Sequence, residues 1–271
     1  HNPDFQLVSI NTARFDVTKH RATPVISDAK IGLKQLSDVL GNWKAPDTWY
    51  QRSIKERNEW DAYVEKQSGP TNQELPSYAH AVGAVYRNAD PSDIVVTAAG
   101  GLVGEVVQIW KPKQINTFET EWGFSCMGYE ISGALGIKMA KPDKDIIVFI
   151  GDGSYLLQNS DIYSSVIYDK KLIIVVCDNS GHMVINRLQL AKGGKEYLCG
   201  LKTSRASNFV EVDFAAHAKS MGAESETVTS TSELEAAFKR AKESKKTYVI
   251  AIKTDGYEWL EGTAFWESPT L

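Results

Sequence analysis

Cysteine is scarce in this chain, with only Cys126, Cys177 and Cys199 among 271 residues. An odd number of cysteines without C-x-x-C spacing argues against a disulfide framework or a structural zinc site. Long apolar runs are also missing. Runs such as Ile146–Ile150 are far shorter than the roughly 20 residues of a membrane helix, and the first residues carry no signal-peptide pattern. These absences predict a soluble, cytoplasmic protein with reduced thiols.

An excess of basic charge is missing as well. The 30 Lys and Arg residues are balanced by 34 Asp and Glu residues, which gives a formal net charge of -4. Because no basic excess can neutralise a phosphate backbone, we expect no nucleic-acid partner, and we expect no membrane partner. The 42% of hydrophobic and 24% of charged residues are typical of an ordinary globular protein with a sizeable core.

The sequence pattern divides the chain into a domain remnant, a helical connector, an α/β domain and a truncated C-terminal tail, at residues 1–30, 31–71, 72–253 and 254–271. The remnant holds two strand-like runs, Phe5–Ile10 and Thr23–Ile26, too few to close a core. The connector places apolar residues at helical spacing over 31–40 and 47–66, which predicts two amphipathic helices.

Helical patterns alternate with β-rich runs in the α/β domain, at Asp93–Thr97, Asp145–Ile150, Leu172–Cys177 and Thr247–Ile252. This alternation predicts an α/β fold with a parallel sheet flanked by helices on both faces. A helix is predicted over Asp213–Gly222, and Ser230–Glu233 predicts a capping box for the next helix. The tail carries aromatic residues without periodicity, so it packs either on another domain or subunit or on the core of this one: Trp259, Phe265 and Trp266.

Chemistry-bearing residues follow two neighbouring strands of the predicted sheet. The run to Ile150 leads into Gly151–Ser154, a strand-to-helix turn whose glycines and free N–H groups favour a phosphate. The next run is followed by Asn179. Because parallel strands end at the same sheet edge, Asp152 and Asn179 should lie together there. A carboxylate, an amide carbonyl and a backbone carbonyl are ligands that suit Mg2+.

Gly151-Asp-Gly153, then 24 residues, then Asp178-Asn179 resembles the diphosphate and metal motif of thiamine-diphosphate-dependent enzymes. That family has Asn where Asp178 stands, whereas its metal-binding Asn is present as Asn179. The resemblance implies thiamine diphosphate and Mg2+ as cofactors and a diphosphate-binding domain fold. It also implies Mg2+ ligands and diphosphate-binding N–H groups, which are Asp152, Asn179 and the Gly181 carbonyl for the former and Gly153 and Ser154 for the latter.

Two upstream segments extend the resemblance. In Trp122–Glu130, Met127 stands where the family has a large apolar side chain that wedges the cofactor into a bent shape. Ser125 would offer its backbone carbonyl to the cofactor's amino group. The loop Ala99–Leu102 matches one that touches the diphosphate, which implicates Gly101 and Leu102. Bending the cofactor brings its amino group onto the reactive carbon, where proximity favours deprotonation.

Within the family, the resemblance is greatest to the branch that hydrolyses trihydroxycyclohexane-1,2-dione in inositol catabolism, in which Asp178 is normal. The segments that carry it are 123–131, 151–156, 177–179 and 185–189. It implies C–C cleavage of a cyclic diketone to 5-deoxyglucuronate. It covers only the C-terminal part of such an enzyme, without the pyrimidine-binding domain and its activating glutamate. We therefore expect that domain on another chain or segment, in a homodimer or homotetramer, with this chain a fragment or a subunit of a split enzyme.

Two other interpretations stay open at this point. A decarboxylase or an acetolactate-synthase-like carboligase would share the cofactor chemistry. A non-catalytic nucleotide-binding module would share the alternating strands, but it should carry G-x-G-x-x-G after its first strand. The chain has Gly-Asp-Gly-Ser-Tyr-Leu from Gly151 instead. Four polar residues follow Gly181 and are candidates either for facing substrate hydroxyls or for packing and solvent-exposed roles: His182, Asn186, Arg187 and Gln189.

Overall fold

The computed structural model describes residues 4–121, 123–202 and 208–261, and the chain divides into two compact units, 1–58 and 59–271. In the first unit, two parallel strands pair and a helix packs beside them. A Cβ at Gly32 would stand 2.8 Å from Ile10 Cγ2, so the glycine allows this close approach. The elements are β1 (Val8–Asn11), α1 (Arg14–Val17), η1 (Lys19–Arg21), β2 (Thr23–Ile26) and α2 (Ala29–Leu40). Helix α3 (Asp47–Gln67) contains the boundary between the units.

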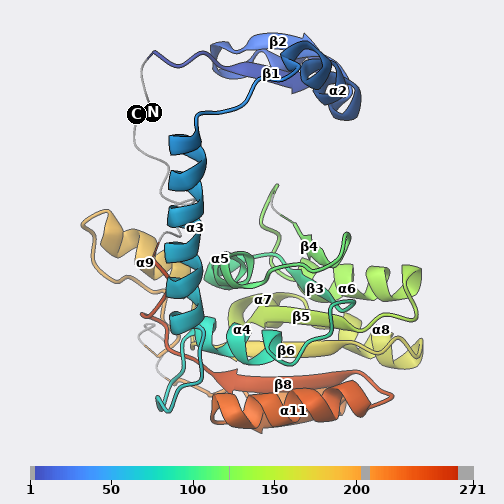
Figure 1. The fold of residues 1–271 in the computed structure, drawn as a ribbon. Helices are drawn as coiled ribbons and strands as arrows, with labels where there is room; N and C mark the ends of the chain where they lie inside the picture. Colours follow the sequence, from blue (N-terminus) through green and yellow to red (C-terminus); the bar gives the residue numbers. More distant parts are fainter. Residues whose placement is uncertain (1–3, 122, 203–207, 262–271) are drawn as a thin grey trace. The chain divides into compact units, whose positions relative to one another are not determined.

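In the described part of the second unit, six parallel strands form one sheet in the order β4-β3-β5-β6-β8-β7 (Figure 1). The strands are β3 (Ile94–Thr97), β4 (Phe118–Thr120), β5 (Ile146–Gly151), β6 (Ile173–Asp178), β7 (Glu224–Val228) and β8 (Tyr248–Lys253). Strands β3, β5, β6 and β8 lie within one residue of the predicted runs. The edge strands β4 and β7 were not predicted, because their short, polar sequences lack the apolar run of a strand that is covered on both faces.

Helices cover both faces of this sheet, which confirms the predicted fold class. One face packs against α4, α5 and α11, and the other packs against α6, α7, α8 and α10. The helices are α4 (Tyr78–Tyr86), α5 (Gly100–Ile109), α6 (Tyr129–Ala140), α7 (Asp152–Leu157), α8 (Asp161–Ile167), α9 (Met183–Ala191), α10 (Phe214–Ser220) and α11 (Thr231–Glu243).

The central strand β5 shows why the apolar runs were informative. Ile147 and Phe149 belong to the core on one face of the sheet, whereas Ile146, Val148 and Ile150 belong to the core on the other, and all five are fully buried. Successive side chains of a strand point to opposite faces, so a strand covered on both faces needs an unbroken apolar sequence. Each such side chain contributes roughly 1.5–3 kcal/mol by burial.

Polar side chains cap the N-terminal ends of α10 and α11. Asp213 accepts a hydrogen bond from Ala216 N at 2.9 Å and starts α10. Ser230 accepts one from Glu233 N at 3.2 Å, as the predicted capping box requires. The return contact of the box is shifted by one residue, since the Glu233 carboxylate accepts from Thr229 N at 2.8 Å. The carboxylate thus holds the residue before the cap.

The tail is anchored to the second unit as far as residue 261. Thr254 N donates to Asp178 O at 2.8 Å, and Leu260, which is 1% exposed, donates its N–H to Glu105 Oε1 at 3.1 Å. Of the two alternatives that the sequence left open for the tail, these residues therefore pack on the core of this domain rather than on another domain or subunit. The predicted aromatic positions Phe265 and Trp266 lie outside the described residues, as does Trp122.

The cysteine thiols are all free, as expected from their number and spacing. In the described ranges, no helix combines the length and the apolar character needed to cross a membrane.

The strand order places a binding site at the carboxyl edge of the sheet. The chain leaves β3 toward β4 on one side and returns to β5 on the other side of β3, so the strand order reverses between β3 and β5. Ligands of open α/β sheets bind at such a reversal. Gly151 pairs with Cys177 in the register of β5 and β6, so Asp152 and Asp178, the next residues, emerge side by side.

Candidate functional site

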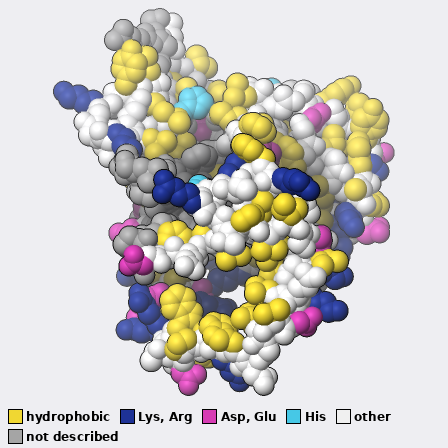
Figure 2. All heavy atoms as spheres, turned by 90° about the horizontal axis from the view of Figure 1, so that it is seen from above, with side chains coloured by type: hydrophobic (Ala, Val, Ile, Leu, Met, Phe, Trp, Pro, Cys, Tyr) yellow, Lys and Arg dark blue, Asp and Glu magenta, His cyan; other side chains and the backbone are white. Residues whose placement is uncertain are grey.

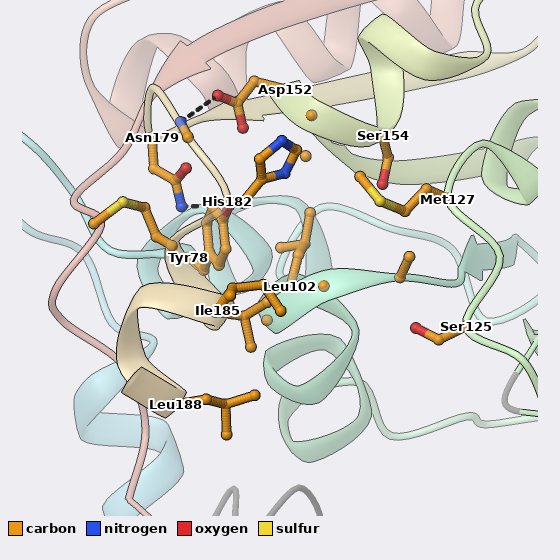
Figure 3. Close-up of a pocket in the computed structure, with 18 residues that line it drawn as sticks. Tyr78, Leu102, Ser125, Met127, Asp152, Ser154, Asn179, His182, Ile185 and Leu188 are labelled. Carbon is orange, nitrogen blue, oxygen red and sulfur yellow. Dashed lines mark hydrogen bonds between the residues drawn. The ribbon is translucent and has the colours of Figure 1, made fainter. Parts of the chain in front are cut away.

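A cavity of about 310 Å³ opens at this edge of the sheet (Figure 3). Its wall comes from the loops after β3, β5 and β6, the loop before α6, the start of α4 and one side of α9. The structure brings together all nine residues that the sequence suggested for the cofactor and the metal, since the lining includes Gly101, Leu102, Ser125, Met127, Asp152, Gly153, Ser154, Asn179 and Gly181. Figure 3 shows Asp152, Asn179 and Tyr78 on one side of the cavity and Met127 and Ser154 on the other.

Asp152 is the buried carboxylate of the cavity, with 1% of its surface exposed. Its Oδ2 accepts a hydrogen bond from Gly181 N at 2.8 Å, which joins the loops after β5 and β6. Burial raises the pKa of Asp152, and the neighbouring Asp178 carboxylate raises it further, against the N–H groups of Gly153 and Gly181. Ionising this carboxyl group is therefore costly, and a cation bound beside it would stabilise the ionised form.

Asn179 supplies the second oxygen. Its Nδ2 donates to Tyr78 OH at 2.7 Å, which turns Oδ1 away from Tyr78. Oδ1 is buried and has no hydrogen-bond partner among the described residues. A buried acceptor without a partner is costly, so this oxygen is suited to a ligand.

These observations fit a hard cation that takes some of its oxygen ligands from a bound ligand rather than from the protein. Across the described ranges, no group of three or more His, Cys, Asp or Glu side chains gathers to hold a metal ion. A metal beside Asp152 would therefore rely on one carboxylate, the Asn179 amide, a backbone carbonyl and oxygens from a bound ligand. This donor set is that of Mg2+, which commonly takes one or two carboxylates plus phosphate oxygens.

Asp178 has a separate task, although it stands in the motif. Its carboxylate pairs with Lys253 on β8 and accepts a hydrogen bond from Ser180 N at 2.8 Å. Lys253 also pairs with Glu211. The lysine compensates the negative charge at the position where the family has a neutral Asn, and the Asp178 carboxylate stabilises the loop that follows β6 through Ser180.

Two features of the backbone shape the cavity. A Cβ at Gly153 would meet His182 Cε1 at 2.8 Å and Met127 Cε at 3.4 Å, so the absent side chain lets the imidazole lie over the turn. Ser125 and Ser180 have positive φ angles of 51° and 59°, an unfavourable conformation for residues other than glycine. Such strain is concentrated at functional loops in many proteins.

Helix α9 presents an apolar wall to the cavity rather than a polar one. Of the four polar candidates that follow Gly181, only His182 is among the lining residues, together with apolar residues of α9: Met183, Val184, Ile185 and Leu188. The other three make contacts elsewhere: Asn186 Nδ2 donates to Glu196 at 3.0 Å, Arg187 lies over the Trp259 ring, and Gln189 accepts from Tyr197 N at 3.1 Å. The side chains of these three residues therefore do not face this cavity.

Tyr78 was missed by the sequence reasoning. It begins α4, and it meets Asn179 across 101 positions of sequence. No local motif marks such a residue, because its contact exists only once the strands are assembled. Burial, followed by the Asp152 charge, raises the pKa of Tyr78 well above its usual value, so its hydroxyl stays protonated.

The fold and the cavity are those of a cofactor-binding α/β domain, and the comparison with protein families gives its class. Residues 98–252 match the family described as thiamine pyrophosphate enzyme, C-terminal TPP binding domain. The chain belongs to this family of thiamine-diphosphate-dependent enzymes, and its cofactor is thiamine diphosphate. The resemblance inferred from the Gly-Asp-Gly motif is confirmed.

Particular relatives narrow the similarity. The chain is 33% identical to the 3D-(3,5/4)-trihydroxycyclohexane-1,2-dione hydrolase of Halalkalibacterium halodurans, over 93% of this chain and 44% of that protein. The protein of the same name from Lacticaseibacillus casei is 34% identical, over 98% of this chain and 45% of that protein. The chain therefore spans less than half the length of these curated relatives.

Solved structures show the same fold in more distant enzymes. The Rhodococcus jostii RHA1 thiamine diphosphate-dependent 4-hydroxybenzoylformate decarboxylase superposes with a TM-score of 0.60 at 18% identity, over 68% of this chain and 34% of that one. Benzoylformate decarboxylase from Polynucleobacter necessarius gives a TM-score of 0.56 at 20% identity, over 70% of this chain and 36% of that one. At this identity, the likeness concerns the fold alone.

Proposed function

We propose that this chain is the C-terminal, diphosphate-binding part of a hydrolase that opens trihydroxycyclohexane-1,2-dione to 5-deoxyglucuronate in inositol catabolism. The observation that carries this proposal is the similarity to hydrolases of that name over 93–98% of the chain, at 33% and 34% identity. When bound, thiamine diphosphate supplies a carbon nucleophile and an electron sink for cleavage of the bond between the two carbonyl carbons.

The chain's own residues would bind and orient the cofactor. Asp152 and Asn179 would hold Mg2+ through their side chains and Gly181 through its carbonyl. The burial of Asp152 and the unpartnered Oδ1 of Asn179 support this assignment. Gly153 and Ser154 would bind the diphosphate through N–H groups, with Gly101 and Leu102 beside it. Asp152 and Asn179 would thus place a cation where its charge could offset that of the diphosphate, in a site where little solvent reaches the Asp152 carboxylate.

Met127 would set the bent shape of the cofactor, with the Ser125 carbonyl beside it. The 38% exposure of Met127 and its place in the cavity wall support a contact with a bound molecule rather than a purely internal packing role. The His182 ring and the Met127 methyl group both lie near the position that a Cβ on Gly153 would take. These two side chains thus border the turn that would bind the diphosphate.

The functional unit would need a second part, the pyrimidine-binding domain with its activating glutamate. The chain spans 44–45% of the relatives' length, which leaves room in them for further domains. Apolar side chains are also exposed near the cavity loops, including Phe124 at 90% and Leu157 at 63%, and Figure 2 shows groups of apolar side chains on the surface. Exposed apolar groups of this kind favour a protein partner. We propose a homodimer or homotetramer whose site lies between domains.

The proposal is tested on the complete enzyme that contains this chain. The enzyme is incubated separately with the cyclic dione, pyruvate and benzoylformate, and the products are identified by mass spectrometry. We expect 5-deoxyglucuronate from the dione and no turnover of the two oxo acids. Acetolactate or an aldehyde as the main product would instead establish a carboligase or a decarboxylase. Asp152→Asn serves as the inactive control, because it keeps the side-chain shape but removes the ligand charge.

A further inference from the structure

Glu130 is a buried carboxylate for which the proposed mechanism has no use. It is the second residue of α6 and is completely buried. Its Oε1 accepts a hydrogen bond from Ala99 N at 3.2 Å, and its Oε2 accepts one from Gly128 N at 2.7 Å. Burial raises the pKa of Glu130, whereas these N–H groups and the Ser154 side chain lower it.

The groups that lower this pKa belong to three separate segments of the cavity wall. Ala99 directly precedes the Gly100–Leu102 turn at the start of α5, Gly128 directly follows Met127, and Ser154 lies in the first turn of α7. Packing alone would not require a carboxylate here, because an apolar side chain avoids the cost of burying a charge. Here the carboxylate accepts main-chain N–H groups from two of these segments, and the side chain of Ser154 in the third adds to the stabilisation of its charge.

The geometry points to Glu130 as a positioning residue that fixes the turn at 98–102, the loop that carries Met127 and the first turn of α7 relative to one another. The inference rests on the proposed cofactor contacts of these segments and extends them to a residue that does not line the cavity.

Glu130→Gln is the sharpest test of this arrangement. The amide keeps the size of the carboxylate but replaces one acceptor oxygen with an NH2 group. Because each carboxylate oxygen accepts a main-chain N–H, the NH2 must face either Ala99 N or Gly128 N, so at least one contact is lost. Glu130→Asp is the second variant: it retains both acceptor oxygens on a shorter side chain and should restore part of the effect.

Glu105→Gln is the matched control. Glu105 is also buried, at 1% exposure, and accepts one main-chain N–H, that of Leu260. Its Oε2 has no hydrogen-bond partner among the described residues, so the amide of the variant can turn its NH2 to that side without meeting a donor. This variant removes a buried carboxylate of the same domain without touching the three segments.

Hydrogen exchange measured by mass spectrometry on the complete, cofactor-free enzyme decides the inference. In Glu130→Gln, we expect exchange to rise about tenfold in peptides covering 98–102, 126–130 and 152–156, with β5 and β6 unchanged, as loss of a charge-assisted contact predicts. Glu105→Gln should leave all three segments as in the wild type. Unchanged exchange in the three segments of Glu130→Gln would overturn the inference, and so would an equal rise across the sheet, which would indicate general destabilisation.

Calorimetric titration with thiamine diphosphate and Mg2+ separates this inference from the proposed function. We expect the cofactor affinity of Glu130→Gln to fall about tenfold, in line with a lost contact to a charged group, and that of Glu105→Gln to stay at the wild-type value. Wild-type affinity in Glu130→Gln would overturn the positioning role. A wild-type enzyme that bound no cofactor would contradict the proposed function, whereas the exchange measurement would still decide the role of Glu130.

Discussion

Removing one hydroxyl group, in Tyr78→Phe, should weaken metal-dependent cofactor binding although Tyr78 itself ligates nothing in the proposed site. The hydroxyl accepts the 2.7 Å hydrogen bond from Asn179 Nδ2 and thereby points Oδ1 away from itself. Without this anchor, the amide can rotate and present its NH2 to the metal. Asn179 would then oppose a cation instead of binding it.

The size of the effect follows from this single contact. A hydrogen bond between neutral groups contributes about 0.5–1.5 kcal/mol net, and 1.4 kcal/mol corresponds to about tenfold in affinity. We therefore expect the dissociation constant of thiamine diphosphate at saturating Mg2+ to rise by about two- to tenfold. The ring of Tyr78 stays in place in the variant, so the cavity should keep its shape.

Isothermal titration calorimetry on the complete enzyme measures this constant, with Tyr86→Phe as the control. Tyr86 ends the same helix and packs its ring edge-on against Trp110 at 5.2 Å between centroids, remote from Asn179. Its loss of a hydroxyl should leave the cofactor affinity unchanged. If Tyr78→Phe bound the cofactor as tightly as the wild type while Asn179→Ala did not bind it, Tyr78 would not orient the amide.

Three further outcomes are expected. Asp152→Asn should abolish metal-dependent cofactor binding by calorimetry, because it removes the only ligand charge; equal binding would refute the metal assignment. Met127→Ala should lower turnover more than cofactor affinity in steady-state kinetics, because the side chain sets the reactive shape; unchanged turnover with weakened binding would make it a packing residue. Lys242→Met should destabilise the fold by about 3 kcal/mol in urea unfolding, because it leaves Asp93 buried and unpaired. Burial lowers the pKa of Lys242, but its bonds to Asp93 and Asp145 outweigh this and raise it, while the pKa of Asp145 is lowered against the effect of its own burial. The lysine's stabilisation is complete below about pH 10 and the Asp145 part is complete above about pH 4, so the deficit should be largest between these values and shrink outside them; a pH-independent deficit would contradict the pairing.

The site motif could be predicted from sequence because its geometry is local. Asp152 and Gly153 follow the apolar run of β5 directly, and Asn179 follows that of β6. The parallel arrangement of two consecutive strands with a helix between them is enough to bring these residues to one edge. The same logic does not reach Asn186, Arg187 and Gln189, for which the sequence left two roles open, because which side of α9 faces the cavity depends on how that helix packs.

The sequence by itself determined the fold class, the central strands and the cofactor motif, because apolar runs and glycine turns act within a few residues of the chain. Only the tertiary structure decided the orientation of Asn179 by Tyr78, the compensation of Asp178 by Lys253 and the role inferred for Glu130. These contacts join segments that are up to 101 positions apart. Their energies depend on burial and on donor–acceptor distances, and both are fixed only when the strands and helices have packed together.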